Sequence, residues 1–345
     1  MARTPPKSGI GIRAVAARAK VSISTVSRFL NGRNVNPDAA QRLLAAVEEL
    51  GYQPDRVARS LRLRHTMTVA MVIPDITNPF FPAVVKGAED TARAAGYALV
   101  LFNAGDDEER EWESLRIAQS MRCDGLLLIM APYGPHHERR RRQLQELDRP
   151  VVYVAAAPDF PADMVVADDL HGSFEAVRYL VRLGHRHVAI IGGNPELSVY
   201  GNRLQGYREA LRASDLEAPP QYEVLVAPTV DDGYSATARL LALPVPPTAI
   251  FAASYRLGIG TMSAIQTHGL RCPEDVSVIG YDQYDWQDVF HPRLTTVAQP
   301  TYLLGARAMD LLIRRMRTGP APPESILLKS SLTARDSCCP PLPRL

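Results

Sequence analysis

Short apolar runs alternate with helical segments through most of this 345-residue chain. A run such as Val69–Ile73 contains no polar residue, as expected of a strand buried on both faces of a parallel sheet. A helical pattern from Pro82 to Gly96 follows it. The alternation predicts βαβ units, enough for an α/β core of two doubly wound parallel-sheet lobes. The apolar runs are Val69–Ile73, Ala98–Phe102, Gly125–Met130, Val151–Ala155, Val188–Gly192, Ala249–Ala253 and Val276–Tyr281.

The first 54 residues lack such runs and have the pattern of three short helices. Apolar residues at positions 12, 15, 16 and 19 follow the spacing of one helix face. Ser22 is a favourable N-cap for a second helix over 23–30. Asn36 and Pro37 begin a third, which Gly51 ends. Three short helices with a tight turn between the first two predict an all-α helix-turn-helix unit. The expected buried stripe of the third helix is Leu43, Leu44, Val47 and Leu50.

Positive charge is concentrated at the N-terminal end of the chain. Residues 1–64 contain twelve Lys and Arg but only four Asp and Glu side chains, whereas the net charge of the whole chain is +2. The remainder of the chain is therefore mildly acidic. A basic helical module on an acidic body is the distribution expected of a protein that neutralises DNA phosphates. A second basic run, Arg139–Arg142, has Glu and Gln neighbours and is interpreted as a solvated helix surface.

The sequence disfavours several classes of protein. No run of 18 apolar residues is present, and the first eleven residues lack an apolar secretory core, so we expect a cytoplasmic protein with no membrane partner. Cys123, Cys272 and the pair Cys338–Cys339 lack metal-binding spacing. Phosphate-loop, dinucleotide-binding, hydrolase-elbow and zinc-protease motifs are absent. We therefore expect neither an enzyme nor a bound cofactor or metal.

Seven segments, in order, resemble motifs of the lactose/galactose repressor family of bacterial transcription regulators. They are VSISTVSRFLNG, EELGYQPDRVARSL, IPDITNPFF, LGHRHVAIIGG, RLQGY, CPEDVSVIGYDQ and PRLTTVAQP. The resemblance covers nearly the whole chain. It implies a homodimer on double-stranded operator DNA, with a core resembling periplasmic sugar-binding proteins. The favoured interpretation is a sequence-specific repressor, associated with the nucleoid when bound to DNA. Its operator affinity would be controlled allosterically by a small polar effector bound between the core lobes.

Within that resemblance, the second helix carries the base-reading positions. Arg28 can bind guanine O6 and N7 in a bidentate manner, and Ile23 can press on a thymine methyl group. A phosphate contact or a surface charge is the alternative for Arg28. The implied base contacts are Ile23, Ser24 and Arg28. Side chains suited to phosphate contacts, which position the protein without reading sequence, are Ser22, Thr25, Ser27 and Asn31. Lys20 stands where the family often has a turn glycine.

The segment after Pro54 is predicted to be a hinge helix. It is too short to be stable alone, so we expect it to order only with a partner chain and DNA. Leu61 matches the family's wedge leucine, which would enter the minor groove and kink the operator. The alternative is that Leu61 is a buried linker residue. The hinge residues are Arg56, Val57, Ala58 and Arg59, with Asp55 as the helix cap.

The resemblance also implies a set of effector contacts at the ends of strand-like runs, where ligands bind in such sheets. They are Asn78, Phe80, Phe81, Arg203, Ser254, Tyr255, Asp282 and Gln299. A buried Arg and Asp facing one cleft must be satisfied by a polar ligand or by each other. The alternatives are loop and core packing for Asn78 and Phe80, and a structural pair between the lobes for Arg203 and Asp282.

Other positions depart from a sugar-binding pattern. Ala155–Ala157 replaces a polar pair, Pro228 replaces an aromatic residue, and Ser254–Tyr255 replaces an Asn-Asp pair. Fewer hydroxyl-binding groups remain than a monosaccharide site has. The effector is therefore expected to be less polar, larger or aromatic, with Tyr255 or Tyr133 as stacking partners. The alternative is that a response to sugar has been lost.

These predictions divide the chain into three parts. Residues 1–54 form the DNA-binding domain, 55–65 the hinge and linker, and 66–345 the effector-binding and dimerisation core. The first lobe would comprise 66–167 and 298–324, and the second 168–297 and 325–345. A dimer is expected because the short C-terminal tail has no heptad. The alternative function, a solute-binding module of a transport system, is disfavoured by the basic helical head and the expected lack of a secretory signal.

Overall fold

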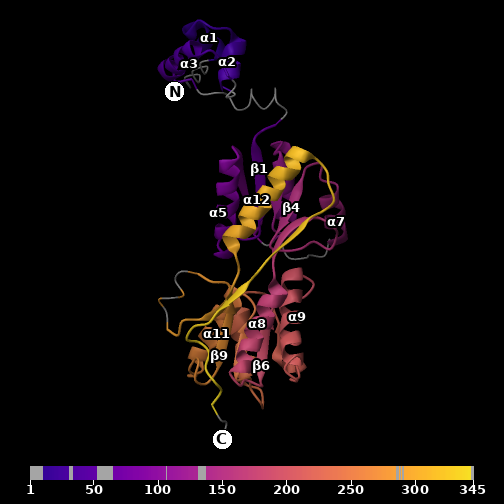
Figure 1. Ribbon diagram of the computed structural model, residues 1–345. Coiled ribbons are helices and arrows are strands. Elements are labelled where there is room, and N and C mark those ends of the chain that lie inside the picture. Colours follow the sequence, from indigo (N-terminus) through magenta and orange to yellow (C-terminus); the bar gives the residue numbers. More distant parts are fainter. Residues whose placement is uncertain are drawn as a thin grey trace, which may run out of the picture. The chain divides into compact units, whose positions relative to one another are not determined.

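The computed structural model describes residues 11–30, 34–52, 65–105, 107–130, 137–284, 287, 289 and 291–342, with the backbone alone for 137–140. The chain divides into two compact units, Met1–Thr66 and Met67–Leu345. Figure 1 shows the helices of the first unit in indigo and the two lobes of the second unit from purple to yellow. The predicted hinge, including Leu61, and Asn31 lie outside the described residues.

The first unit contains the three predicted helices, α1 (Ile12–Ala19), α2 (Ile23–Leu30) and α3 (Pro37–Leu50). The predicted caps of α2 and α3 are confirmed: Ser22 Oγ accepts a hydrogen bond from the Thr25 amide at 3.1 Å, and Asn36 Oδ1 accepts one from Asp38 at 2.9 Å. One core prediction is wrong, because Leu44 is 60% exposed. The stripe of α3 that faces the other helices has smaller residues at helical spacing. Its buried members are Ala39, Leu43 and Ala46, and the predicted residues Val47 and Leu50 pack on the same core while partly buried.

The second unit contains two six-stranded sheets, which confirms the predicted α/β core. The first sheet has the strand order β11-β5-β4-β3-β1-β2. Its strands are β1 (Thr68–Ile73), β2 (Ala98–Asn103), β3 (Gly125–Leu128), β4 (Val151–Val154), β5 (Asp163–Ala167) and β11 (Ser325–Leu328). All of its neighbouring strands are parallel. Its helices are α5 (Phe80–Ala94), α6 (Glu108–Ser120), α7 (His137–Gln145) and α12 (Thr301–Thr318).

The second sheet has the strand order β12-β10-β9-β8-β6-β7. Its strands are β6 (Val188–Gly192), β7 (Glu223–Leu225), β8 (Ala249–Ala252), β9 (Ser277–Tyr281), β10 (Thr295–Ala298) and β12 (Ser331–Thr333). Only the edge strand β12 is antiparallel to its neighbour within the described sheet. The second lobe also contains the 3-10 turn Pro220–Tyr222. Its helices are α8 (Asp169–Arg182), α9 (Ser198–Arg212), α10 (Val230–Leu241) and α11 (Tyr255–Thr267).

Each sheet is the middle layer of a three-layer lobe. In β1, Val69 and Met71 belong to the core beneath α5 and α12, whereas Ala70 and Val72 belong to the core beneath α6. Alternate residues of a strand point to opposite faces, so a strand covered on both sides must be apolar throughout. This burial explains the continuous apolar runs from which the lobes were predicted.

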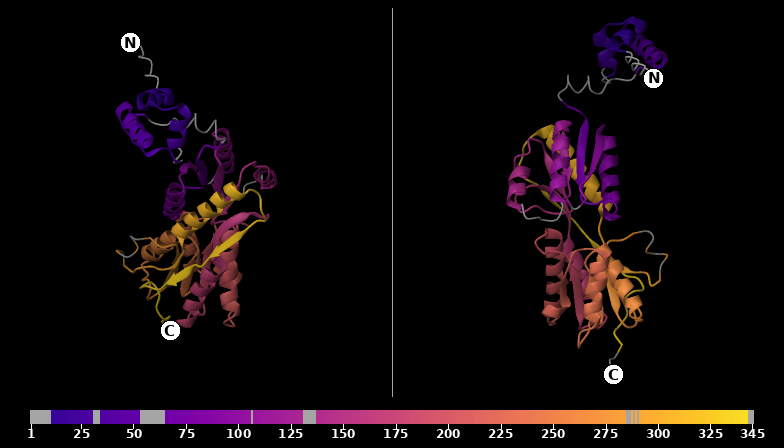
Figure 2. Two further views of the ribbon diagram at one scale, coloured as in Figure 1. Left: turned by 45° about the horizontal axis from the view of Figure 1, so that its top comes forward. Right: turned by 180° about the vertical axis from the view of Figure 1, so that it is seen from behind.

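The C-terminal part of the chain crosses between the lobes more than once. After β10 the yellow segment enters the first lobe as α12 and β11, then returns to the second lobe as β12 (Figures 1 and 2). The predicted lobe boundary at 324/325 is therefore wrong, because Ser325–Leu328 pairs with β5 in the first sheet. The crossing falls between Leu328 and Ser331, where only Lys329 and Ser330 separate the two strands.

Close helix packing in the first lobe depends on two glycines. A Cβ atom on Gly305 of α12 would lie 1.8 Å from the Val84 carbonyl oxygen of α5, and one on Gly87 would lie 2.0 Å from the Tyr302 carbonyl oxygen. The two backbones therefore approach each other more closely than any side chain permits. This contact fixes α12, and with it the start of the crossover beside Gln299.

Candidate DNA-binding helix and interlobe pocket

Helix α2 has one apolar face and one polar face. Val26 is fully buried against α1 and α3, and Phe29 and Leu30 pack on the same core. Ser24 and Arg28 are exposed, and Ile23 is 47% exposed although it is a large apolar residue. The three side chains predicted to read bases therefore lie on the open face of the helix. An exposed isoleucine on such a face suits contact with a thymine methyl group.

The turn before α2 is tight and well defined. Lys20 has a left-handed backbone conformation with φ of 53°, and its amide donates to the Ala16 and Ala17 carbonyl oxygens. Glycine adopts this left-handed backbone conformation at a lower energetic cost than lysine, which is a physical reason for the glycine that the family often has here. Ser22 Oγ lies 2.7 Å from Ser24 Oγ and 2.8 Å from Thr25 Oγ1. Ser22, Ser24 and Thr25 thus form one cluster of hydroxyls at the N-terminus of α2, and Ser27 is half-buried one turn later.

A pocket of about 770 Å³ lies between the two lobes of the core. Its walls come from the carboxyl ends of strands in both sheets, as expected for doubly wound lobes. All eight residues predicted to bind an effector line this pocket: Asn78, Phe80, Phe81, Arg203, Ser254, Tyr255, Asp282 and Gln299. The predicted residues therefore meet at one cavity, while the role of each residue in binding stays a prediction.

Arg203 is held in a buried network that the sequence did not predict. Its Nε and Nη2 lie 2.9 Å from Asp169 Oδ1, and its Nη1 donates to the Ala253 carbonyl oxygen at 2.8 Å. The guanidinium also lies over the Tyr281 ring, 3.5 Å from the ring centroid. Burial would lower the pKa of Arg203, and the adjacent Asp169 more than offsets this, so the pKa is raised. The sequence predicted that Arg203 would be paired with a polar ligand or with Asp282. Its hydrogen bonds are instead accepted by Asp169 and Ala253.

Asp282 has separate partners at the end of β9. Gln299 Nε2 donates to Asp282 Oδ1 at 2.7 Å, which ties the crossover segment to the second lobe. The backbone φ of Asp282 is 72°, in the left-handed region. Burial raises the pKa of the Asp282 carboxyl group, although Arg203 and Gln299 favour its charged form. Asp282 is therefore a buried carboxyl group at the pocket wall with a weakened tendency to ionise.

Two further pairs connect the lobes beside the pocket. Arg256 at the start of α11 forms an ion pair with Asp75, which follows β1 in the other lobe. The Ala157 amide donates to Ser198 Oγ at 2.9 Å, again from one lobe to the other. Sequence patterns did not predict a role in this site for Asp75, Arg256, Asp169 and Tyr200. Arg256 could have been found, because it follows the predicted residues Ser254 and Tyr255 directly.

The departures from a sugar-binding pattern are found in the pocket wall. Ala155, Ala156 and Pro228 line the pocket, where polar or aromatic residues were replaced. Tyr255 also lines it, whereas Tyr133 lies outside the described residues. Tyr200, from α9, is an aromatic lining residue that the sequence analysis did not identify. The pocket wall therefore has fewer polar side chains than a site built to bind sugar hydroxyl groups.

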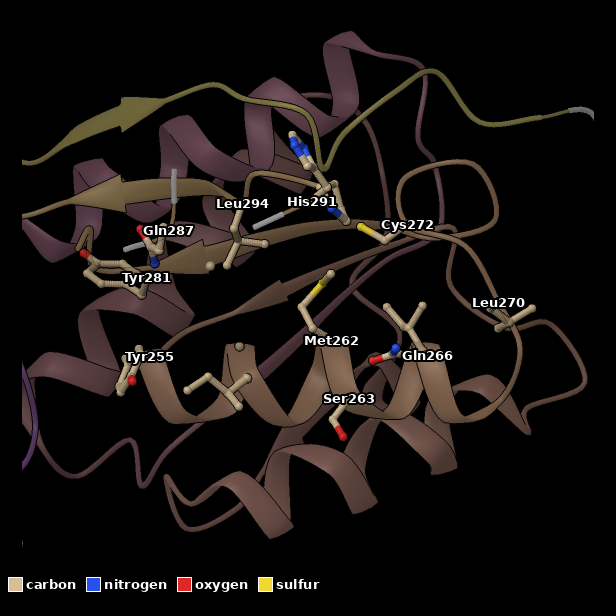
Figure 3. A pocket seen from close by; sticks show the side chains of 15 residues that line it. Tyr255, Met262, Ser263, Gln266, Leu270, Cys272, Tyr281, Gln287, His291 and Leu294 are labelled. Carbon is tan, nitrogen blue, oxygen red and sulfur yellow. The ribbon is translucent and has the colours of Figure 1, made fainter. Parts of the chain in front are cut away.

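A second cavity of about 480 Å³ lies within the second lobe, between α11, β9 and the side chains of Gln287, His291, Pro292 and Leu294. Met262 on α11 points toward Leu294 and Cys272 across it (Figure 3). We assign no ligand to this cavity. Among the described residues no cluster of His, Cys, Asp and Glu could hold a metal ion, and no helix could span a membrane.

Two family models match the chain. Residues 11–55 match the model described as bacterial regulatory proteins, lacI family, and residues 177–338 match a periplasmic binding protein-like domain. The HTH-type transcriptional repressor CytR of Escherichia coli (strain K12) is 35% identical over 94% of this chain and 94% of its own length. The chain belongs to the lacI family. This lacI-family protein is a DNA-binding transcriptional regulator, and the helix-turn-helix unit decides against a transport module.

Further similarities agree with this assignment. HTH-type transcriptional regulator RegA of Clostridium saccharobutylicum is 32% identical over 94% of this chain and 98% of its own length. A transcriptional regulator CelR-cellobiose complex is 31% identical with a TM-score of 0.72, covering 95% of this chain and 99% of that chain. The lac repressor dimer bound to operator and the anti-inducer ONPF is 24% identical and has a TM-score of 0.84, covering 96% and 100%. The last similarity confirms the fold alone.

Proposed function

We propose that this regulator is a homodimeric repressor in the bacterial cytoplasm, whose affinity for its operator changes when a small molecule binds between the core lobes. The observation that carries the proposal is the pocket itself. All eight residues predicted for effector binding line one cavity of about 770 Å³, in a chain that also has a DNA-binding unit. This volume lies in the range of ordinary small-molecule sites. Solved relatives named with cellobiose and ribose support a ligand in such a core.

The contacts between the lobes suggest how the signal is produced. Asp75–Arg256 and Ala157–Ser198 join the lobes next to the pocket. A ligand that contacts both walls changes the relative stability of the lobe arrangements by its differential affinity for them. The proposed hinge, residues 55–65, then transmits the change to the DNA-binding domain, residues 1–54. A coupling free energy of about 1–3 kcal/mol would alter operator affinity about 5- to 150-fold.

Fluorescence anisotropy of the full-length protein tests this proposal. An operator would first be selected from random DNA, and its affinity then measured with and without candidate effectors at fixed salt, because phosphate contacts make affinity salt-dependent. We expect a two-half-site operator and at least one compound that changes its affinity. Sedimentation of the free protein should give a dimer. Specific operator binding that no pocket-binding compound alters would contradict effector control.

The proposed base contacts can be tested in the same assay. Arg28→Ala should weaken specific binding by about 1–3 kcal/mol and relax preference for one guanine. Arg42→Ala is the matched control, because Arg42 is an exposed arginine of α3 and its loss removes the same charge. Equal effects of the two changes would assign Arg28 to general phosphate attraction. Leu61→Ala should reduce operator bending, measured by gel mobility of permuted fragments, and unchanged bending would remove Leu61 as the wedge.

A further inference from the structure

The turn between α1 and α2 holds one residue in a left-handed backbone conformation, and that residue is Lys20. The Lys20 amide donates to the Ala17 carbonyl oxygen at 3.3 Å, and the Val21 amide donates to the Ala16 carbonyl oxygen at 3.1 Å. This pair of hydrogen bonds ends a helix with a left-handed residue. Val21 is half-buried against the core of the first unit, which fixes the turn. The φ of 53° at Lys20 therefore follows from the hydrogen bonds and packing of the turn.

The same turn ends α3, and there the left-handed residue is a glycine. Gly51 has a φ of 58°, its amide donates to the Glu48 carbonyl oxygen at 3.2 Å, and the Tyr52 amide donates to the Val47 carbonyl oxygen at 3.0 Å. Glycine has no Cβ atom to approach the neighbouring carbonyl oxygen in this conformation, whereas lysine has one. A lysine therefore makes the first turn less stable than a glycine would.

The side chain of Lys20 gains nothing from the core that would offset this cost, because it is exposed. Its positive charge lies on the part of the first unit that has no acidic side chain. Residues 11–30, which form α1, the turn and α2, contain Arg and Lys but no Asp or Glu. The described acidic residues of the unit are all on α3: Asp38, Glu48 and Glu49. Such an uneven distribution favours the approach of a polyanion to α1 and α2.

The two cations at the end of α1 differ in their partners. Arg18 Nη2 forms an ion pair with Glu49 Oε2 at 2.5 Å, which directs Arg18 toward α3. No ion pair or hydrogen bond joins the Lys20 ammonium group to another residue in the described part of the first unit. The Lys20 charge is therefore available to an external anion, whereas Arg18 already has a carboxylate beside it.

Lys20 also lies next to the side chains that are predicted to contact phosphates. Ser22, two residues later, belongs to the hydroxyl cluster that includes Ser24 and Thr25. Two residues of chain span at most about 7 Å, a distance comparable with the length of the four-carbon lysine stem. A phosphate bound by these hydroxyls, or the phosphate next to it, is within reach of the Lys20 ammonium group.

We propose that Lys20 binds a backbone phosphate of the DNA, one for each subunit, and that the turn between α1 and α2 is less stable than it could be because it places this cation there. Lys20 thereby adds a charged contact to the neutral phosphate-binding side chains predicted around α2. A glycine at this position gives a more stable turn and weaker binding to DNA of any sequence. The inference concerns the DNA-binding unit alone and does not depend on control by an effector.

The salt dependence of DNA binding tests the contact in the full-length protein. Lys20→Gln removes the charge and keeps a long side chain in the turn. Each neutralised phosphate contributes about 0.9 to the slope of log affinity against log salt concentration, so the slope should become shallower by about 0.9 per subunit. Fluorescence anisotropy measures it on the selected operator and on a random-sequence duplex. Both affinities should fall by the same factor, because phosphates carry no sequence information, and Lys20→Arg should retain the wild-type slope.

Arg18→Gln is the matched control. It removes one positive charge from the same end of α1, but from a side chain that is paired with Glu49. Its slope should stay closer to that of the wild type. Equal slopes for Lys20→Gln and the wild type overturn the proposal. Equal changes for Lys20→Gln and Arg18→Gln also overturn it, because they indicate general attraction, and so does a loss of affinity for the operator alone, because it indicates a base contact.

Replacement of single phosphates in the DNA tests the contact directly. An uncharged methylphosphonate is placed at one position at a time, symmetrically in both halves of the selected operator. At one position it should weaken binding of the wild type severalfold more than binding of Lys20→Gln, which is the non-additivity expected of two groups in contact. If every replacement weakens both proteins by the same factor, Lys20 does not contact a phosphate.

Hydrogen exchange in the full-length protein tests the cost of the contact, because exchange of the α1 and α2 amides reports the local stability of the first unit. Lys20→Gly should slow this exchange severalfold and weaken DNA binding as much as Lys20→Gln does. Gly51→Lys is the reciprocal change in the matching turn of α3, where no atom lies within 4 Å of an added Cβ atom, and it should speed exchange. Exchange in Lys20→Gly that is no slower than in the wild type overturns the claim that Lys20 strains the turn.

Discussion

The two lobes have matching strand orders but contribute different chemistry to the pocket between them. The second lobe provides the buried network of Asp169, Arg203 and Asp282, whereas β3 and β4 of the first lobe provide apolar residues. The buried charged network thus lies on the second lobe, and the first lobe contributes a wall with fewer polar side chains. A ligand anchored to the second lobe gains its remaining contacts only when the first lobe lies against it, which makes occupancy sensitive to lobe arrangement.

The largest expected difference between the lobes concerns their buried ion pairs. Arg203→Met would leave Asp169 buried without its main partner, so we expect a loss of about 3–5 kcal/mol in the free energy of unfolding. The comparable change in the first lobe is Arg315→Met, which breaks a more accessible pair with Asp163. Its expected cost is about 1.5–3 kcal/mol, the range for hydrogen bonds to charged groups. Urea unfolding followed by circular dichroism measures both, and equal losses would contradict the stronger dependence of the second lobe on its buried pair.

Helix contacts provide a smaller comparison of the lobes. Gly305→Ala places a methyl group 1.8 Å from the Val84 carbonyl oxygen, and Gly206→Ala places one 2.3 Å from the Leu170 carbonyl oxygen. Each should destabilise its lobe by about 1–3 kcal/mol through overpacking, with the larger cost in the first lobe. Gly11→Ala is the control, because no atom lies within 4 Å of its added methyl group. Thermal unfolding measures the three variants. A cost for Gly305→Ala no greater than that of the control would show that α5 and α12 can separate freely.

A pH dependence is expected from the second lobe. His185 is buried and bonded to Thr248 Oγ1 and the Cys339 carbonyl oxygen, both at 2.9 Å. Burial lowers its pKa below the usual 6.5, so the unfolded chain takes up a proton at higher pH than the folded chain. Stability should therefore fall as pH decreases below about 6.5, by on the order of 1 kcal/mol. Melting temperatures at pH 7.5 and 5.5 test this. His185→Gln should flatten the dependence, whereas the half-buried control His171→Gln should retain it; an unchanged slope in His185→Gln would contradict the assignment.

Sequence patterns located the pocket well because its residues follow strand ends. Asp282 and Gln299 come directly after strands β9 and β10, and Asn78 lies in the loop after β1, so parallel strands bring these positions together. The partner of Arg203 could not be found in this way. Asp169 begins a helix next to the capping residue Asp168, a position where acidic residues are common for local reasons. Only the packing of α8 against α9 brings Asp169 to Arg203.

Two errors have similar physical causes. The boundary at 324/325 failed because β11 and β12 are separated by only two residues, too short a connection to show from the sequence that they join different sheets. Leu44 was expected to be buried because leucine is apolar, but the face of α3 that packs on the other helices consists of other residues, and Leu44 lies outside it. In both cases the local sequence predicts the strand or helix, but tertiary packing determines which sheet or core that strand or helix joins.

The smallest expected effect concerns the ion pair that joins the lobes. The side chains of Arg256 and Asp75 are 32% and 19% exposed, and solvent screening limits such a pair to about 0.2–1 kcal/mol. A double-mutant cycle of Arg256→Gln and Asp75→Asn on thermal unfolding should give a coupling free energy in this range. The surface pair Arg293–Asp336, with 46% and 42% exposure, is the control within one lobe.

Both double-mutant cycles measure the strength of an ion pair, but only the Asp75–Arg256 pair, which joins the lobes, should also alter lobe closure. Small-angle scattering should therefore show a larger radius of gyration in Arg256→Gln than in Arg293→Gln, and identical scattering curves would show that Asp75–Arg256 does not hold the lobes together.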